Sequence, residues 1–175
     1  MFLLVRAGHE SGLDVHYYIF SANLAGTASG IGVAGVERVS GLFPWHANAD
    51  NNPYDIYNQE FKRKYRSAQN FDYIVAHRAV EMLARAVVDA HSDDPLKVAY
   101  ALEGMSSDGP EGHAVIRAED HQMIVPLYLA KLVKVGDAGP KFDVEGTGLG
   151  WKTVTKAESK DMVPPLKCRI DRPAP

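Results

Sequence analysis

Seven histidines are the side chains of this 175-residue chain best suited to metal binding. His9 and His16 fall in different predicted elements, and a predicted turn separates His113 from His121. No two histidines have the His-x-x-x-His spacing that places a pair of metal ligands on one helix face. We therefore interpret them as surface or hydrogen-bonded histidines and predict no metal site.

Two further patterns contain the residue types of catalytic or nucleotide-binding motifs. Asp120-His121 places an acid beside a base, but the chain has no Gly-x-Ser-x-Gly elbow, and adjacent residues rarely form a working dyad. Glycines at positions 26, 30, 32 and 35 follow a predicted strand, yet the next strand lacks the acidic residue of the dinucleotide fingerprint. We predict that these glycines allow close helix packing. The sequence predicts neither a cofactor nor an enzymatic activity.

Aromatic side chains near the ends of two predicted strands suggest binding of a small ligand. Tyr18 and Phe20 end the first of these strands, and Trp45 follows the second. Loops beyond the strand ends of open α/β sheets are common ligand sites, and Ser21 and Asn23 would supply polar contacts there. The alternative is that alternate aromatic residues of this segment face the core. Both interpretations stay open at this point.

Composition restricts the class of protein that must position these residues. The chain is 46% hydrophobic and 23% charged, with 19 Lys and Arg against 22 Asp and Glu, which is typical of a globular protein. A net charge of −3 lacks the basic bias of a nucleic-acid-binding protein. No apolar run approaches the roughly 20 residues needed to span a membrane. A single cysteine excludes an internal disulfide framework.

The order of predicted elements indicates an α/β fold. Strands and helices alternate along the chain, with turn signals between them. The predicted strands cover residues 15–20, 36–43, 113–117 and 125–135, and the predicted helices cover residues 2–10, 27–34, a segment beginning at Pro53, 71–90 and 95–104. Residues 136–150 read as a glycine-rich loop and residues 163–175 as an extended tail.

The helix over residues 71–90 is the clearest of these elements. Its polar residues recur every four positions, at His77, Glu81, Arg85 and Asp89, and nearly all its other residues are apolar. One narrow polar stripe predicts a mostly buried helix packed against a sheet.

The beginning of the chain predicts a fragment of a longer fold. The apolar run that starts at Met1 stops at Arg6, and no cleavage site for a signal peptide follows it. We interpret residues 2–10 as a helix that ends near Gly12.

Several segments of the chain resemble the C-terminal half of periplasmic solute-binding proteins of ABC transporters, in particular the branched-chain amino-acid (Leu/Ile/Val-type) receptors. The most specific segment is Gly112 to Gln122, with the pattern Gly-x-x-x-Ile-Arg-Ala-x-Asp-His-Gln before Pro126-Leu127-Tyr128. The other matching segments are Gly12-Leu13-Asp14-Val15, Phe61-Lys62-Arg63-Lys64-Tyr65, Ala84-Arg85-Ala86-Val87, Asp94-Pro95-Leu96-Lys97-Val98, Ala101-Leu102-Glu103-Gly104-Met105 and Gly146-Thr147-Gly148-Leu149-Gly150-Trp151.

The resemblance implies a periplasmic-binding-protein type I fold with Rossmann-like lobes, truncated to its C-terminal half. Residues 1–50 would belong to the second ligand-binding lobe, residues 51–135 would return to the first lobe, and residues 136–175 would form a crossover and an extended tail. Such proteins capture a small solute in a cleft between two lobes and deliver it to a membrane permease. The family is periplasmic, and the Asp120-His121-Gln122 turn is structural in it.

The resemblance also bears on the ligand. The amino-acid binders place an acidic group where this chain has Ser21-Ala22-Asn23-Leu24, so a small carboxylate, an amide or a urea is an alternative to an α-amino acid. The ligand contacts implied are Tyr18, Phe20, Ser21, Asn23 and Trp45. The alternative function is a stand-alone sensory domain that self-associates as a homo-oligomer. Cys168 is either a free thiol or the partner of a cysteine outside this chain.

Overall fold

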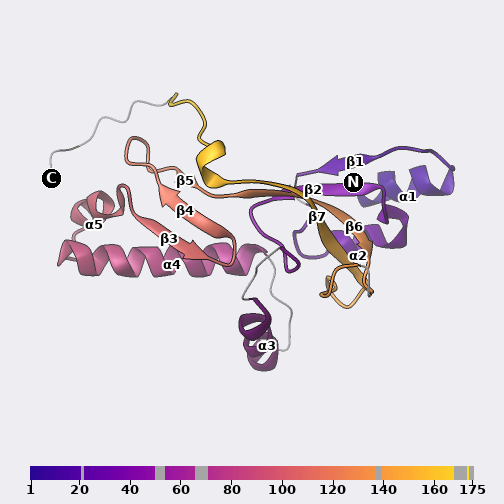
Figure 1. The fold of residues 1–175 in the computed structure, drawn as a ribbon, viewed down its shortest axis with the longest axis horizontal. Coiled ribbons are helices and arrows are strands. Elements are labelled where there is room, and N and C mark those ends of the chain that lie inside the picture. Colours follow the sequence, from indigo (N-terminus) through magenta and orange to yellow (C-terminus); the bar gives the residue numbers. More distant parts are fainter. Residues whose placement is uncertain (21, 50–53, 66–70, 137–138, 168–172, 174–175) are drawn as a thin grey trace.

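The computed structural model describes residues 1–20, 22–49, 54–65, 71–136, 139–167 and 173. Its elements form two groups, each built on its own β-sheet, which meet in a central region crossed by two long strands (Figure 1). Helices and strands alternate through both groups, as the sequence predicts.

The larger sheet has the strand order β1-β2-β6-β7, with β1 (Tyr17–Ile19), β2 (Val39–Phe43), β6 (Leu127–Lys134) and β7 (Leu149–Ala157). Strands β1 and β2 are parallel, because the crossover through α2 (Thr27–Ile31) and the 3-10 turn η1 (Gly32–Gly35) returns the chain to the same end of the sheet. Helix α1 (Phe2–Glu10) packs with them over one face. The buried core of this group is formed by Val5, Ile19, Ala22, Ala28, Ile31, Ala34, Val39, Phe43, Ala130, Leu132, Leu149 and Trp151.

Strands β6 and β7 pair along their whole length and contain one irregularity. Thr153 pairs with Ala130 and Thr155 with Leu129, so Val154 has no partner in the ladder. This extra residue is a β-bulge, which bends the strand and increases its twist. The loop predicted over residues 136–150 ends at Leu149, where β7 begins, and β7 itself was not predicted.

The smaller sheet has the order β3-β4-β5, with β3 (Ser106–Gly109), β4 (Gly112–Ile116) and β5 (Met123–Ile124), all antiparallel. Helices α4 (Phe71–Ala90) and α5 (Pro95–Leu102) pack beneath it around Met82, Ala86, Val98 and Met105. Helix α5 begins as predicted, because the Asp94 carboxylate accepts hydrogen bonds from the backbone N–H groups of Leu96 and Lys97.

Pro126 interrupts the strand predicted over residues 125–135. The structure has β5 and β6 instead, in different sheets, with the proline between them. Proline lacks the backbone N–H that a ladder needs, so it ends one pairing before the next begins. Strand β3 was not predicted, because its Ser-Ser-Asp-Gly sequence has no strand propensity of its own.

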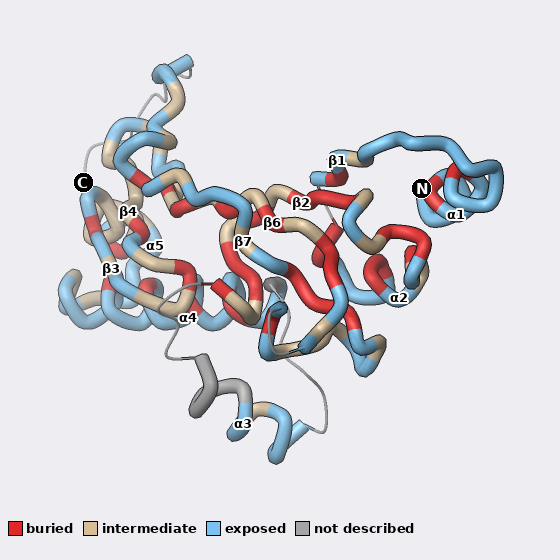
Figure 2. Tube along the Cα trace, turned by 45° about the vertical axis from the view of Figure 1, so that its right-hand side comes forward, coloured by how far each residue is buried: buried red, intermediate tan, exposed pale blue. Residues whose placement is uncertain are grey.

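The prediction of a mostly buried helix over residues 71–90 is wrong, although its bounds are confirmed. Among the side chains described in α4, only Ile74, Arg78, Met82 and Ala86 are buried, one per turn, and the others are largely exposed (Figure 2). Its apolar surface extends around both sides of the helix, and the smaller sheet covers only one of them.

Helix α3 (Tyr54–Tyr65) is the element least enclosed by the two sheets (Figure 1). Its Phe61 ring lies 4.9 Å from the Tyr73 ring of α4, measured between centroids. The predicted start of this helix at Asn52-Pro53 falls outside the described residues. Within the described ranges, no helix has the length and apolar character needed to cross a membrane.

Candidate functional site

The carboxyl ends of β1 and β2 lie at the same edge of the larger sheet because the two strands are parallel neighbours. Tyr18 lies in β1 and Phe20 directly follows the strand, on either side of the buried Ile19, so the two side chains belong to the opposite, open face. They are 74% and 78% exposed, among the most exposed large apolar residues described. The His16 ring contacts the Tyr18 ring, and its Nε2 atom lies 2.9 Å from Ser40 Oγ.

Asn23 and Trp45 lie together but away from the open face. Both are buried, and Asn23 Nδ2 donates a hydrogen bond to the backbone oxygen of Trp45 over 3.2 Å. The Trp45 side chain packs with Ile74 of α4 and with Phe142. The structure therefore divides the predicted contacts into an exposed pair, Tyr18 and Phe20, and a closed pair, Asn23 and Trp45. Ser21 lies outside the described residues.

Residues just beyond β2 form a joint between the two groups of elements, which we call the neck. His46 is 2% exposed, and its ring makes edge contacts with Phe43 and with Tyr128 of β6. Its Nε2 atom lies 2.9 Å from Thr153 Oγ1 on β7. Burial lowers the pKa of His46 from 6.5 to about 4. Nothing in the sequence distinguishes this histidine from the other six.

Asn48 fastens the neck to the segment before β7. Its Nδ2 atom donates to the backbone oxygen of Phe142 over 2.8 Å, and its Oδ1 atom accepts from the Phe142 N–H over 2.7 Å. A side-chain amide that pairs both backbone groups of one residue holds two chain segments in a fixed register.

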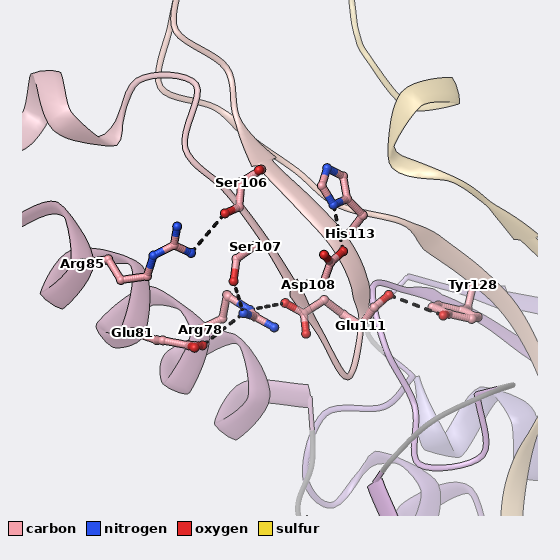
Figure 3. Close-up of polar contacts among 9 residues, drawn as sticks. All are labelled: Arg78, Glu81, Arg85, Ser106, Ser107, Asp108, Glu111, His113 and Tyr128. Atoms are coloured by element: carbon pink, nitrogen blue, oxygen red, sulfur yellow. Dashed lines mark hydrogen bonds and ion pairs between the residues drawn. The ribbon is translucent and has the colours of Figure 1, made fainter. Parts of the chain in front are cut away.

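A buried ion pair joins α4 to the turn between β3 and β4 (Figure 3). Arg78 Nε donates to Glu111 Oε1 over 2.8 Å, and Arg78 Nη1 donates to Glu81 Oε2 and to Ser107 Oγ. The Tyr128 hydroxyl donates to the backbone oxygen of Glu111 over 3.4 Å, which connects this network to the neck. Glu111 Oε2 is buried and has no hydrogen-bond partner in the described part of the chain.

The network has the character of a structural contact. Arg78 and Glu111 are each about 95% buried and face one another across two elements. On the solvent side, Arg85 Nη1 donates to the backbone oxygen of Ser106, and His113 Nδ1 lies 2.8 Å from Asp108 Oδ1. The Arg85 contact attaches the hairpin to the helix, and the His113 contact joins the two strands of the hairpin.

The Asp120 turn is held by Arg117. The guanidinium donates to both carboxylate oxygens of Asp120 and to Gln122 Oε1, and its Nη1 atom donates to the backbone oxygen of Pro164. Hydrogen bonding from Arg117 lowers the pKa of Asp120 to about 2. His121 points elsewhere and pairs with Glu103 at 2.9 Å. Asp120 and His121 are therefore engaged with different partners.

In the ranges that the structure describes, no three His, Cys, Asp or Glu side chains gather closely enough to hold a metal ion. A cavity of about 360 Å³ lies at the opposite end of β2 from Trp45, and it is lined by Val36, Glu37, Val133, Lys134, Gly136, Gly139 and Lys152.

The chain is similar to known proteins in sequence and in structure. A family model described as periplasmic binding protein matches residues 1–139. No curated protein matches the chain. Among solved structures, a leucine-, isoleucine-, valine-, threonine- and alanine-binding protein from Brucella ovis, in its closed conformation, has a TM-score of 0.85 at 17% identity, over 98% of this chain and 44% of its own.

Two further structures come from Rhodopseudomonas palustris. A branched-chain amino acid transporter of the ABC type has a TM-score of 0.60 at 25% identity, over 75% of this chain and 34% of its own. A solute-binding protein of an ABC transporter in complex with p-hydroxybenzoic acid has a TM-score of 0.70 at 17% identity, over 90% of this chain and 41% of its own. The chain thus spans less than half the length of these structural relatives.

Proposed function

Because this chain belongs to the periplasmic binding protein family, we propose that it is part of the solute-binding component of an ABC transporter. The component captures a small carboxylate or amino-acid-like solute between two lobes and delivers it to a permease in the membrane. It binds without performing chemistry, as expected of solute-binding proteins. Its place of action is the periplasm.

The match of the family model over residues 1–139 carries this proposal. It is supported by the exposure of Tyr18 and Phe20 at the carboxyl ends of parallel strands, where an α/β lobe presents ligand contacts. Ser21, which follows Phe20 in the sequence, stays a proposed polar contact, and the buried Asn23 and Trp45, joined by a hydrogen bond, would support the site from behind.

We assign the chain to lobes as the family resemblance suggests. Residues 1–50 belong to the second lobe, residues 51–135 return to the first lobe, and residues 136–175 form the crossover and tail. The larger sheet takes strands from all three segments, since β6 pairs with both β2 and β7. Crossings of this kind are what a hinge between two lobes requires.

The ligand class follows from the side chains of the second lobe. The relatives' names include amino acids and p-hydroxybenzoic acid. Residues 22 and 23 of this chain are Ala and Asn, so neither has an acidic side chain that could pair with a ligand ammonium. Tyr18 and Phe20 offer exposed aromatic faces instead. A small carboxylate with an apolar or aromatic body fits these groups better than an α-amino acid does.

The proposal is tested by titrating the isotopically labelled chain with benzoate, p-hydroxybenzoate and L-leucine. We expect dissociation constants on the order of millimolar, because one wall leaves most of a ligand exposed whereas a complete cleft buries about 70–90% of it. Amide signals near Phe20 shift first, and Phe20→Ala abolishes the shifts. The matched control is Val154→Ala, at the opposite edge of the sheet, which leaves them unchanged. Shifts that survive Phe20→Ala contradict the site.

A second candidate function, self-association, is favoured by the outer face of α4. Val80 and Val88 are each 67% exposed and Leu83 is 49% exposed, on the side of the helix that the smaller sheet leaves open. Contiguous exposed apolar residues of this kind mark interaction surfaces.

Sedimentation velocity distinguishes this candidate. We expect the chain to associate with rising concentration and Val80→Glu to shift it toward the monomer. The control Val33→Glu changes an equally exposed valine on η1 and leaves association unchanged. A monomer at all concentrations contradicts self-association and does not affect the ligand proposal.

A further inference from the structure

His46 occupies the point in the neck where four segments of the chain meet. Phe43 at the end of β2 and Tyr128 at the start of β6 contact its ring at centroid distances of 5.9 and 5.5 Å. The Thr153 hydroxyl on β7 lies next to the Nε2 atom of the ring, and the backbone N–H of Asn48 lies next to its Nδ1 atom. The ring is therefore enclosed by the strands that join the two groups of elements.

The two hydrogen bonds fix the protonation state of the ring. The Asn48 N–H can only donate, so Nδ1, 3.3 Å away, must be the unprotonated nitrogen. Nε2 then carries the hydrogen and donates to Thr153 Oγ1 over 2.9 Å. A second proton on Nδ1 would turn this nitrogen from an acceptor into a donor. Two N–H groups would then point at each other, and the hydrogen bond from Asn48 would be lost.

The segment that carries His46 also contacts α4. Trp45 precedes it and packs against Ile74, and Asn48 follows it and holds both backbone groups of Phe142. A displacement of residues 45–48 therefore acts on both groups of elements at once. The Phe43 ring at the end of β2 also contacts the Trp151 ring of β7, at a centroid distance of 5.1 Å.

We propose that His46 holds the neck together only while its ring is neutral, so that the neck responds to pH. With a neutral ring it holds residues 45–48 against β7, and protonation of the ring releases them, so that the two sheets change their relative orientation. This inference goes beyond the proposed function and does not depend on any ligand.

The charged groups around the neck do not stabilise a charged imidazole. Lys156 of β7 lies over the Tyr128 ring and pairs with Glu158, while Glu111 pairs with Arg78. These two carboxylates, among the residues that the structure describes, are thus already paired with cations, and burial is the cause that lowers the pKa of His46 to about 4.

The expected pH range follows from linkage. A released His46 has the ordinary pKa of 6.5, so the enclosed site prefers the neutral ring by roughly 300-fold. Protonation is therefore coupled to release: the equilibrium shifts toward the released state as the pH falls below 6.5, and this shift reaches its full size, about 300-fold, below about 4.

The test measures a distance between the two groups of elements. Spin labels are placed at Ser29→Cys on α2 and Ala84→Cys on α4, both exposed, in a chain that also carries Cys168→Ser. At pH 7.5 we expect one narrow distance distribution. Between pH 6 and pH 3.5 a second population grows reversibly while the far-UV circular dichroism is retained.

Three variants tie the change to this histidine. His46→Gln keeps a polar side chain without a titrating ring and removes the pH dependence. Thr153→Val loses the acceptor for Nε2, weakens the enclosed state and raises the midpoint toward 6.5. Thr153→Ser keeps a hydroxyl and leaves the midpoint unchanged.

Each of three results overturns the proposal: a distance that does not respond to pH, the same midpoint in His46→Gln as in the parent chain, or loss of circular dichroism at that midpoint. If His46→Gln fails to fold, imidazole NMR of the parent chain replaces it. The titration of His46 must then coincide with the distance change, and a mismatch between the two midpoints likewise overturns the proposal.

Discussion

At the scale of single residues, Gly109 shows how a turn is fitted to a buried ion pair. A Cβ atom at this position would lie 1.1 Å from Arg78 Nη2 and 2.8 Å from Glu111 Oε2. The backbone of Gly109 is not in the left-handed region, so the requirement is for space. The missing side chain leaves room for the guanidinium to reach the Glu111 carboxylate.

We therefore expect Gly109→Ala to displace Arg78 and break the pair. A buried ion pair that loses its partner costs about 3–5 kcal/mol, so the free energy of unfolding falls by roughly that amount. Urea denaturation measures it. Gly136→Ala is the matched control, since its Cβ would meet nothing within 4 Å, and equal stability of the two variants contradicts this account.

The residue scale also shows what the sequence could and could not specify about the candidate contacts. Alternation in a strand places Tyr18 and Phe20 on the side opposite Ile19, but the sequence left open whether that side faces a ligand or the core. Both side chains are exposed, and their contact with a ligand stays a prediction. Alternation gives no information on Trp45, whose ring turns toward Ile74, because that contact joins residues 29 positions apart. Asn23 is likewise engaged by a backbone oxygen of a distant loop.

At the scale of elements, α4 shows that a sequence pattern can specify the bounds of a helix without specifying which of its sides is buried. The bounds of the helix were predicted because local signals set them. Its burial was not, because periodicity reports which residues are apolar and not which apolar side is covered. In the described structure, the smaller sheet covers the side with Met82 and leaves Leu83 half exposed.

Alanine substitutions at Met82 and Leu83 compare how much the covered and the open side of α4 contribute to the free energy of unfolding. Met82→Ala creates a cavity in the core of the smaller group, and we expect a loss of about 2–5 kcal/mol. Leu83→Ala removes a side chain that is 49% exposed, and we expect a loss of at most about 1 kcal/mol. Thermal and urea unfolding of both variants provide the comparison. Equal losses would mean that another surface covers the outer side of α4 in solution.

At the scale of the whole molecule, the predicted class, an α/β fold of the periplasmic-binding-protein type I, is confirmed by structural relatives that match 90–98% of the chain. Sequence motifs such as Asp120-His121-Gln122 were sufficient for this because they lie in turns with fixed contacts. The neck was not predicted, since it depends on His46, Tyr128 and Thr153, which meet only after the chain has passed from the larger sheet to the smaller sheet and back.

The tail is attached to the rest of the molecule through the Asp120 turn. Arg117 binds Asp120 and the backbone of Pro164 at once, so the charge of this carboxylate affects how firmly the tail is held. Its pKa is lowered from 3.8 to about 2, chiefly by the hydrogen bond from Arg117. A lowered pKa means that the folded state favours the ionised form. Its stabilising effect is therefore full above pH 3.8 and is lost as the pH falls through about 2.

We expect the parent chain to be more stable than Asp120→Asn at pH 7 and the difference to disappear between pH 4 and pH 2. The measurement is the midpoint of thermal unfolding of both chains across this range. Comparison of the two chains cancels the contribution of His46, which is present in each. Asp14→Asn, which alters a fully exposed carboxylate, serves as the control, and a difference that persists at pH 2 contradicts the assignment.

The bulge in β7 determines where this strand can change in length. Val154 is the extra residue between two pairs, Thr153 with Ala130 and Thr155 with Leu129, so its deletion would leave every other pair of the ladder in place. A deletion elsewhere in β7 would turn each following side chain to the other face of the sheet, including Lys156, which lies over Tyr128. Natural variants of this fold that differ by one residue in the strand are therefore expected to differ at position 154.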